Sequence, residues 1–360
     1  MRFEELNKIP VKTARRQGVN SVSVEMDDLK INEFKNFSIS GDENVSISKL
    51  EKNNKYFKKL KYGVKEELIR EADESFTNGF LIEVKENCKI KGNVILNFNL
   101  DENNSTLIDN IIIIAKKNSE ANFIINYNSN DLGKYHNGVL RIFAEEDSNI
   151  KVSKINMLGK NVTSFDSNIS FVKENANVDF IAIELGAKNN VSNYEARLEE
   201  KNSKADINVI YTGIDEEKID MNYVVTIEGE NSRTNINIKG ALKDKAVKTF
   251  KGTLDFKKGA KKSKGVEEEY CMLLSEKARS KAIPLLLCDE DDVSGEHAAS
   301  SGRIDENKLF YLMSRGISYN EAKLLIINAA FNPIIDKIES EEIQNKILEK
   351  IREILKEDKL

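Results

Sequence analysis

One short pattern recurs seven times along the chain, and it restricts the possible folds more than any single residue does. Each copy has an apolar residue, a short charged run, an Asn, Asp or Gly turn signal and then a small residue. The small residues are Cys88, Ser119, Ser148, Ala176, Ser203, Ser232 and Ala260, at intervals of 31, 29, 28, 27, 29 and 28 residues. A repeat of this length indicates a solenoid, a propeller or another array in which each unit buries its face against its neighbours.

Residues 79–303 have the pattern of short strands between these turns. Residues 80–84, 122–127, 206–211 and 234–238 are rich in β-branched residues and often alternate between apolar and polar. Pro284 is the only proline in this region, as expected where strands need their backbone donors. No helical pattern of 10–15 residues separates the strands, so βαβ units are disfavoured. We predict a mainly β fold with a parallel β-helix core; a β-sandwich is the alternative, but it explains a near-constant period less well.

The region before the core, residues 1–78, lacks the repeat. We predict a mixed or helical region there, with a helical stretch around residues 64–70. Residues 13–17 form a basic cluster, which we interpret as a solvated surface, with a partner contact as the alternative.

The region after the core, residues 304–360, predicts helices. Asp305 can cap a first helix that stops at Gly316, and Ser318 with Glu321 forms a capping box for a second. We also expect a new helix start at Pro333 and a final helix from Ser340. The second helix should have one apolar face, formed by Ala322, Leu325, Ile326 and Ala329. The final helix should have another, formed by Ile343, Ile347, Ile351 and Ile354. We expect these helices to cover the end of the solenoid and to offer a docking surface.

Composition narrows the classes of function. A formal net charge of −5 argues against a dedicated nucleic-acid binder. Three cysteines, Cys88, Cys271 and Cys288, do not make a disulfide framework, which favours a reducing cytoplasm. The charged N-terminus does not resemble a signal peptide, and the apolar runs are shorter than the ~18–20 residues of a membrane span. We therefore expect a cytoplasmic protein with no membrane partner.

Several catalytic motifs are missing from the sequence. It contains no phosphate-binding loop, no Gly-x-Ser-x-Gly elbow, no His-Glu-x-x-His and no Cys-x-x-Cys pair. Only His136 and His297 could supply an imidazole. His136 lies in a loop-like context, and we interpret it as structural; we interpret Cys88, at a small-residue position of the repeat, as a packing residue.

Residues 283–317 carry a resemblance to a known family. The segments that match are IPLLLC (283–288), GEHAASSGRI (295–304) and LFYLMSRGI (309–317). They closely resemble the C-terminal region of the SufB/SufD family, the scaffold subunits of the SUF iron–sulfur cluster assembly machinery. The resemblance implies a right-handed parallel β-helix flanked by helical regions, and a complex with the SUF ABC-type ATPase docked on the C-terminal helices. It also implies pairing through the β-helices, with a second copy or a second family member, and a nascent cluster near that contact.

The same resemblance suggests cluster ligands. His297, preceded by Glu296, matches a motif of the family proposed to bind the cluster, and Cys288 falls where SufB proteins often carry cysteine. A further cysteine of SufB aligns with Glu269, two positions from Cys271, so this chain departs from the family there. The candidate ligands of a transient cluster of unknown type are therefore His297, Cys288, Cys271, Glu296 and Glu269. Iron prefers thiolate, with imidazole or carboxylate as substitutes.

The sequence thus predicts a non-catalytic scaffold for iron–sulfur cluster assembly. We expect Phe310, Tyr311, Leu312 and Arg315 to contribute to the ATPase docking surface. One alternative is a structural solenoid that binds protein without metal. The least favoured alternative is a polysaccharide-active β-helix enzyme, since the acidic residues are scattered over the repeat turns and Trp is absent.

Overall fold

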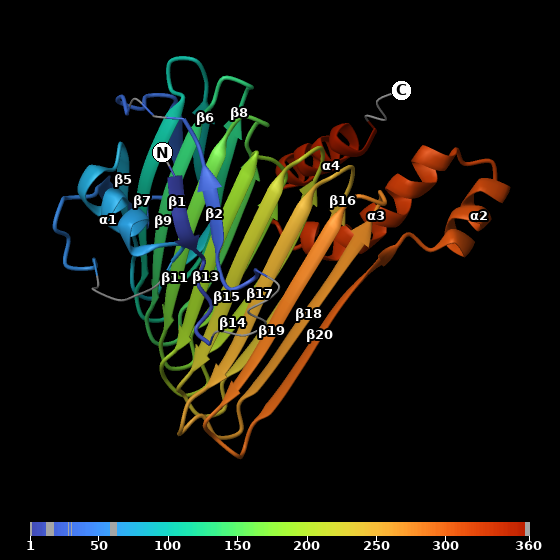
Figure 1. The fold of residues 1–360 in the computed structure, drawn as a ribbon. Helices are drawn as coiled ribbons and strands as arrows, with labels where there is room; N and C mark the ends of the chain where they lie inside the picture. Colours follow the sequence, from blue (N-terminus) through green and yellow to red (C-terminus); the bar gives the residue numbers. More distant parts are fainter. Residues whose placement is uncertain (1, 12–17, 28, 30, 58–62, 357–360) are drawn as a thin grey trace.

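The core of the molecule is a stack of coils in which each coil gives one strand to each of two sheets (Figure 1). The computed structural model describes residues 2–11, 18–27, 29, 31–57 and 63–356. Consecutive strands alternate between the sheets, and strands from successive coils pair in parallel within each sheet. The predicted parallel β-helix is confirmed. The sandwich alternative is wrong, because stacking of coils, rather than antiparallel hairpins, builds the two layers.

Both sheets have nine strands. All pairs are parallel except β3–β6 and β4–β5, which are antiparallel. Sheet 1 has the order β20 (Ser294–Arg303), β18 (Lys264–Leu273), β16 (Arg233–Leu242), β14 (Lys204–Gly213), β12 (Asn177–Glu184), β10 (Asn149–Met157), β8 (Glu120–Ser129), β6 (Lys89–Leu100) and β3 (Phe37–Ser40). Sheet 2 has the order β19 (Arg279–Cys288), β17 (Val247–Phe256), β15 (Lys218–Ile227), β13 (Asn189–Leu198), β11 (Thr163–Val172), β9 (Tyr135–Ala144), β7 (Thr106–Ala115), β5 (Asn78–Val84) and β4 (Val45–Lys49).

The recurring pattern of the sequence marks the turns that lead from sheet 2 to sheet 1. The residue before each small residue has a positive φ, for example 58° at Asn202, and Asn, Asp and Gly tolerate this conformation best. The Asn side chains also form a ladder across coils: Asn202 donates to Asn175 at 2.9 Å, and Asn231 donates to Asn202 at 2.6 Å. The repeat is therefore a turn signal with a backbone cause.

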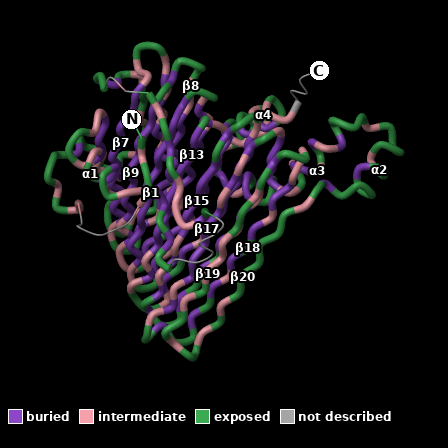
Figure 2. Tube along the Cα trace, in the orientation of Figure 1, coloured by how far each residue is buried: buried purple, intermediate pink, exposed green. Residues whose placement is uncertain are grey.

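The space between the two sheets, here called the lumen, holds the main hydrophobic core. Side chains alternate along each strand, so every second residue points into the lumen. Because strands of successive coils pair in register, lumen residues stack in columns, such as Phe180, Ile207 and Ile236. Figure 2 shows the resulting buried interior, and it shows greater exposure along β19 and β20.

The N-terminal region covers the outer face of sheet 2. Strands β1 (Arg2–Leu6) and β2 (Val22–Glu25) form a hairpin, and helix α1 (Glu66–Ser75) packs Leu68, Ile69 and Ala72 against outward-facing residues of β7, β9 and β11. The predicted helical stretch is confirmed, although the helix starts at Glu66. The strands β1–β4 were not predicted. The basic cluster at residues 13–17 lies outside the described residues.

The C-terminal region forms three helices: α2 (Glu306–Ser314), α3 (Tyr319–Ile335) and α4 (Glu341–Lys356). The predicted cap at Asp305 and the capping box at Ser318 are confirmed. The predicted restart at Pro333 is wrong, because Pro333 lies inside α3. The predicted face of α3 is wrong in part: Leu325 and Ala329 are exposed, whereas Ala322 is buried.

Helices α3 and α4 lie on the outer face of sheet 1, and not over the end of the stack. Buried residues of α3 and α4, such as Ile327 and Ile347, belong to one cluster with outward-facing residues of sheet 1, such as Ile183 and Ile210. The expectation that the helices cover the end of the solenoid is therefore wrong. Helix α2 extends away from the sheets (Figure 1). None of the helices in the described part of the chain is long and apolar enough to cross a membrane.

Candidate functional site

The last coil of the stack, β19 with β20, has no further coil on top of it among the described residues. Strand β19 pairs only with β17, and β20 pairs only with β18. We call this pair the open coil. Most residues of β20, including His297, are exposed, and Leu286 of β19 is 40% exposed. The resemblance places the candidate ligands in this coil and in the coil beneath it.

Strand register decides which candidates share a face. In β18, Glu269 and Cys271 are buried and point into the lumen. His297 of β20 is in register with Glu267, which also points into the lumen, so His297 lies on the same face one coil later. Neighbouring strands are ~4.8 Å apart, and residues two apart on a strand are ~6.7 Å apart. His297 thus shares the lumen face with Glu269 and Cys271, but along the strand Glu269 is two residues and Cys271 four residues, about 13 Å, from the position beneath His297.

The other two candidates are placed differently. Cys288 is in register with the core residue Phe256, so it also belongs to the lumen face, but at the far end of β19. Glu267 of sheet 1 lies opposite Gly252 of sheet 2, because its carboxylate lies against that glycine. One coil later, His297 takes the position of Glu267 and Pro284 takes the position of Gly252, so Pro284 lies opposite His297. Cys288 is therefore four residues, or about 13 Å, beyond the position opposite His297.

Glu296 is adjacent to His297 in the chain but does not share its face. It is in register with Val266, on the opposite face of the sheet from Glu267. The sequence motif that pairs Glu296 with His297 therefore directs one side chain outward and the other into the lumen.

Cys271 and Glu269 are held by contacts within the chain. Burial raises the pKa of the Cys271 thiol, while the nearby Lys248 ammonium acts in the opposite direction. Glu269 forms an ion pair with Lys248 inside the lumen and accepts a hydrogen bond from the hydroxyl of Tyr211 at 3.0 Å. Its charge is therefore already compensated. Cys288, by contrast, is exposed, with its thiol 3.0 Å from the carbonyl oxygen of Glu290.

Glu267 is a buried residue of this region that the sequence reasoning missed. It is 1% exposed, and neither carboxylate oxygen has a hydrogen-bond partner among the described residues. Burial, with a smaller effect from the charge of Glu269, raises the pKa of Glu267 to about 8. The signal that could have found it is the repeat itself, because the equivalent residue of the preceding coil is the apolar Ile236.

No complete metal site is present within the described part of the chain. No three His, Cys, Asp or Glu side chains there are arranged to hold a metal ion.

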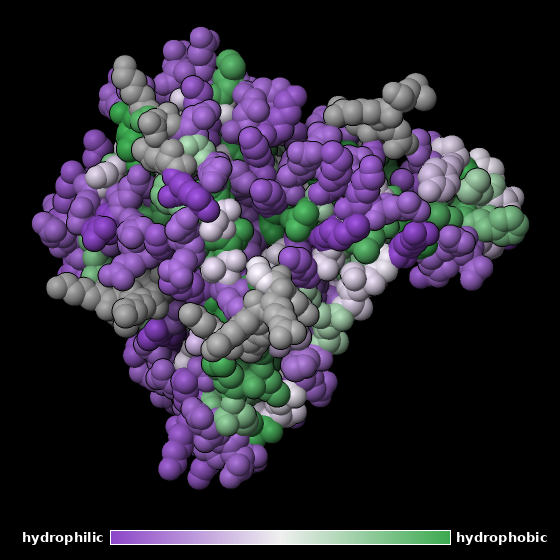
Figure 3. All heavy atoms as spheres, viewed as in Figure 1, coloured by the Kyte–Doolittle hydropathy of each residue, from purple (hydrophilic) through white to green (hydrophobic). Residues whose placement is uncertain are grey.

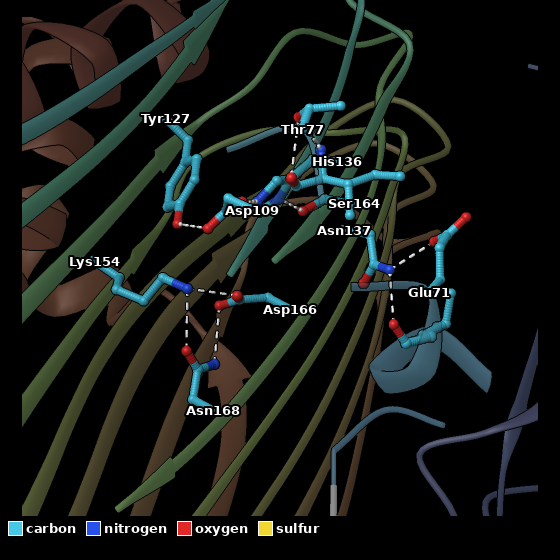
Figure 4. A network of polar contacts seen from close by, with 12 residues as sticks. Glu71, Thr77, Asp109, Tyr127, His136, Asn137, Lys154, Ser164, Asp166 and Asn168 are labelled. Atoms are coloured by element: carbon cyan, nitrogen blue, oxygen red, sulfur yellow. Dashed lines mark hydrogen bonds and ion pairs between the residues drawn. The ribbon is translucent and has the colours of Figure 1, made fainter. Parts of the chain in front are cut away.

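His136 lies in strand β9, so its assignment to a loop-like context is wrong. Its side chain belongs to a network of polar contacts (Figure 4). Its ring nitrogens lie 2.9 Å from the Ser164 hydroxyl and 2.8 Å from an oxygen of Asp109, and Tyr127 donates to the other Asp109 oxygen at 2.9 Å. All of these side chains are essentially unexposed, so no substrate reaches Ser164 in this structure. The geometry supports a structural role for His136.

Helix α2 carries the residues expected at a docking surface. Phe310 is 73% exposed and Tyr311 is 57% exposed, and the Arg315 guanidinium lies 5.3 Å from the centre of the Tyr311 ring. Leu312 differs, because it packs partly against the cluster beneath α3. Phe310 also lines a surface pocket of about 510 Å³ together with Arg303. Hydrophobic residues gather at this projecting end (Figure 3).

Comparison with known proteins shows the family to which the chain belongs. The family described as "SUF system FeS cluster assembly, SufBD core domain" matches residues 98–330, more than half of the chain. The iron-sulfur cluster assembly protein SufD of Bacillus subtilis is 41% identical over 117 residues, which are 32% of this chain and 27% of that protein.

Longer matches are found in staphylococci. An iron-sulfur cluster assembly SufBD family protein of Staphylococcus epidermidis is 25% identical over 297 residues, 77% of this chain and 63% of the relative. One of Staphylococcus aureus is 25% identical over 307 residues, 82% of this chain and 64% of the relative. The chain therefore spans less than two thirds of the length of these relatives. It belongs to the SufBD family of the SUF iron–sulfur cluster assembly system.

Proposed function

We propose that this chain is a non-catalytic scaffold subunit on which a transient iron–sulfur cluster is assembled in the cytoplasm. The observation that carries the proposal is the open coil, the last coil of the solenoid, which has a neighbouring coil on one side only and carries His297 on the lumen face above the coil that holds Glu269 and Cys271. Every earlier coil of the core is paired on both sides, the first of them with β3 and β4, so among the described coils the open coil is the one that leaves both of its strands free on one side.

A second subunit is the natural occupant of the open coil. Two exposed strand edges present unpaired backbone groups, which pair readily with another chain. Iron–sulfur clusters use about four protein ligands, more than the described residues of this chain offer at one place. We propose that a second copy, or another family member, adds its own last coil and completes the ligand set.

The proposed partner of α2 is the SUF ABC-type ATPase. Exposed aromatic side chains on a projecting helix are typical of a protein-binding surface. ATP-driven closure of that partner would pull on α2 and loosen the contact between the open coils. This chain needs no nucleotide site of its own for that role.

Anaerobic reconstitution with ferrous iron and sulfide tests the scaffold. The wild-type protein should gain visible absorbance of a cluster, and His297→Ala should gain much less, while Glu230→Gln at an exposed turn serves as the control. No absorbance in wild type, with the ATPase present, would refute the scaffold and favour the metal-free solenoid. The absence of a complete ligand set in the described residues is the observation that keeps that alternative in view.

Two further variants test the contacts. Ala298→Lys adds a charge to the exposed edge strand β20 and should abolish dimerisation in light scattering. Phe310→Ala with Tyr311→Ala should abolish co-purification with the ATPase, whereas Glu342→Gln on α4, also exposed, should not. Unchanged dimerisation or unchanged co-purification would refute the corresponding contact.

A further inference from the structure

Glu267 interrupts a column of apolar residues in the lumen. In the preceding coils the register places Val94, Phe123, Val152, Phe180, Ile207 and Ile236 at this position, one above the other. All of them belong to the buried core. In the last coil before the open coil, the same position holds a carboxylate. A buried carboxylate without partners is costly, so its presence needs a reason.

The opposite sheet changes at the same coil. The column that faces Glu267 contains Tyr194 and Tyr223 and then Gly252. A Cβ atom on Gly252 would overlap the carboxylate of Glu267, so the loss of a side chain at Gly252 makes the room that the carboxylate occupies. The next residue of this column is Pro284, which has no N–H to donate. The two sheets together provide space for a carboxylate but no hydrogen bond to it.

The residue above Glu267 in its own column is His297. The two Cα atoms are one strand spacing apart, ~4.8 Å, and both side chains belong to the lumen face. The nearest lysine of the lumen, Lys248, is already paired with Glu269. Glu267 therefore has two carboxyl oxygen atoms without a hydrogen-bond partner among the described residues, one coil beneath the exposed residue His297.

We propose that Glu267 and His297 together bind a ferrous ion at the open end of the lumen, an inference that rests on the proposed scaffold function. A carboxylate oxygen and an imidazole nitrogen are both suitable ligands for divalent iron. The remaining coordination positions are left to water, to sulfide or to a side chain of a second subunit. Glu269, which aligns with a cysteine of SufB, stays with Lys248, so the iron-binding carboxylate is the residue two positions earlier.

Cobalt(II) is the probe for this site, because it replaces ferrous iron without oxidation and has a visible spectrum. The full chain is titrated anaerobically with cobalt(II) and followed by absorbance and calorimetry. Glu267→Gln and His297→Ala should each weaken binding at least tenfold. Glu268→Gln is the matched control, since Glu268 is the next residue of β18 but is exposed on the other face, and it should bind within twofold of wild type.

Gly252→Ala gives an independent test that leaves every proposed ligand in place. Its methyl group occupies the space of the Glu267 carboxylate, so cobalt(II) binding should again fall at least tenfold. This variant decides the question if Glu267→Gln does not fold. Binding by Glu267→Gln or Gly252→Ala as tight as wild type, or no cobalt(II) binding by wild type, would overturn the inference.

Cluster reconstitution in parallel separates this inference from the scaffold proposal. If Glu267→Gln binds cobalt(II) and assembles a cluster as wild type does, the iron site is wrong and the scaffold stands. If wild type binds cobalt(II) through Glu267 but forms no cluster with iron and sulfide, the iron site stands and the scaffold proposal fails.

Discussion

A buried ion pair fastens the N-terminal strand to the outer face of sheet 2, and its removal should destabilise the protein strongly. The ammonium of Lys251 is fully buried and lies 2.8 and 3.0 Å from the two oxygens of Asp220. It also donates to the backbone carbonyl of Asn7 at 3.0 Å, and the Asn7 side chain donates to Asp220 at 2.8 Å. One lysine thus satisfies two buried acceptors from segments more than 200 residues apart.

Lys251→Met keeps the volume of the side chain and removes its charge. The variant leaves Asp220, itself 5% exposed, with only the amide of Asn7 as a side-chain partner among the contacts described above. Removing one member of a buried ion pair costs about 3–5 kcal/mol, because the remaining charge is buried without compensation. A second change, Asp220→Leu, should restore much of this loss, since burying neither charge is often as favourable as burying both.

Urea unfolding followed by circular dichroism measures the effect on the midpoint, and limited proteolysis reports release of the N-terminal strand. Lys245→Met is the matched control, because Lys245 lies 2.8 Å from Glu216 across the same kind of coil spacing but both side chains are exposed. Its midpoint should match wild type, as surface ion pairs contribute little. Equal urea midpoints for Lys251→Met and Lys245→Met would refute the reasoning. The reasoning would also fail if Asp220→Leu did not restore the stability of Lys251→Met and the N-terminal strand of Lys251→Met stayed fully resistant to protease.

Three further predictions concern the turn, the lumen and the helices. Asn202→Ala should lower the free energy of unfolding by about 1–2 kcal/mol, because it removes the hydrogen bonds of the Asn ladder and places a Cβ atom at φ 58°. Asn202→Gly should lose only the hydrogen bonds and should therefore be the more stable of the two variants. Equal unfolding midpoints for the two variants would contradict this. Burial raises the pKa of Glu184 to about 7, so the folded state favours the protonated side chain. The stability that this protonated form provides is complete below about pH 4.5 and is lost as the pH rises through 7. In urea unfolding, the free energy of unfolding of Glu184→Gln should therefore equal that of wild type near pH 4.5 and exceed it by about 2–3 kcal/mol at pH 8. The exposed control Glu230→Gln should not show this difference. Ile327→Ala, at a fully buried position of α3, should lower the free energy of unfolding by about 2–5 kcal/mol, whereas Leu325→Ala, at an exposed position, should lower it by less than about 1 kcal/mol. A lower melting temperature for Leu325→Ala than for Ile327→Ala would contradict the packing of α3.

The stack of coils could be predicted because its signal is local and repeated. A positive φ follows the sheet 2 strands β5, β7, β9, β11, β13, β15 and β17 and selects Asn, Asp or Gly. The next residue must be small because it turns inward, as the buried Ser203 does. The sequence carries both requirements every 27 to 31 residues. The antiparallel closing strands β3 and β4 carry no such repeat, so only their contact with the first coil identifies them.

The face of α3 could not be predicted from helical spacing alone. Its residues are apolar almost all round, so periodicity does not decide which of Leu324 and Leu325 is buried. The columns of outward-facing Ile residues on sheet 1 decide it, and these columns exist only after the coils have stacked. For the same reason, the helices could not be assigned to the side of the solenoid before sheet 1 was known to have an apolar outer face.

Part of the candidate site was also predictable. His297 and Cys271 were identified from the resemblance and do share the lumen face. Glu267 was missed because three consecutive Glu residues in a strand suggest a solvated segment, although alternation must bury either the middle one or the outer two. Comparing each repeat position across coils, rather than reading along the strand, would have shown that Glu267 replaces Ile236.

The position of this replacement within the stack is itself informative. A carboxylate in the middle of the solenoid would be covered by many coils, and a metal ion could not reach it without opening them. Glu267 is separated from the open end by one coil only, whose nearest residues are His297 and Pro284. Burial beneath one coil keeps water away from the carboxylate, yet opening that single coil exposes it. A partner that pulls on α2, which follows β20 directly in the chain, would act on the strand of this coil that carries His297.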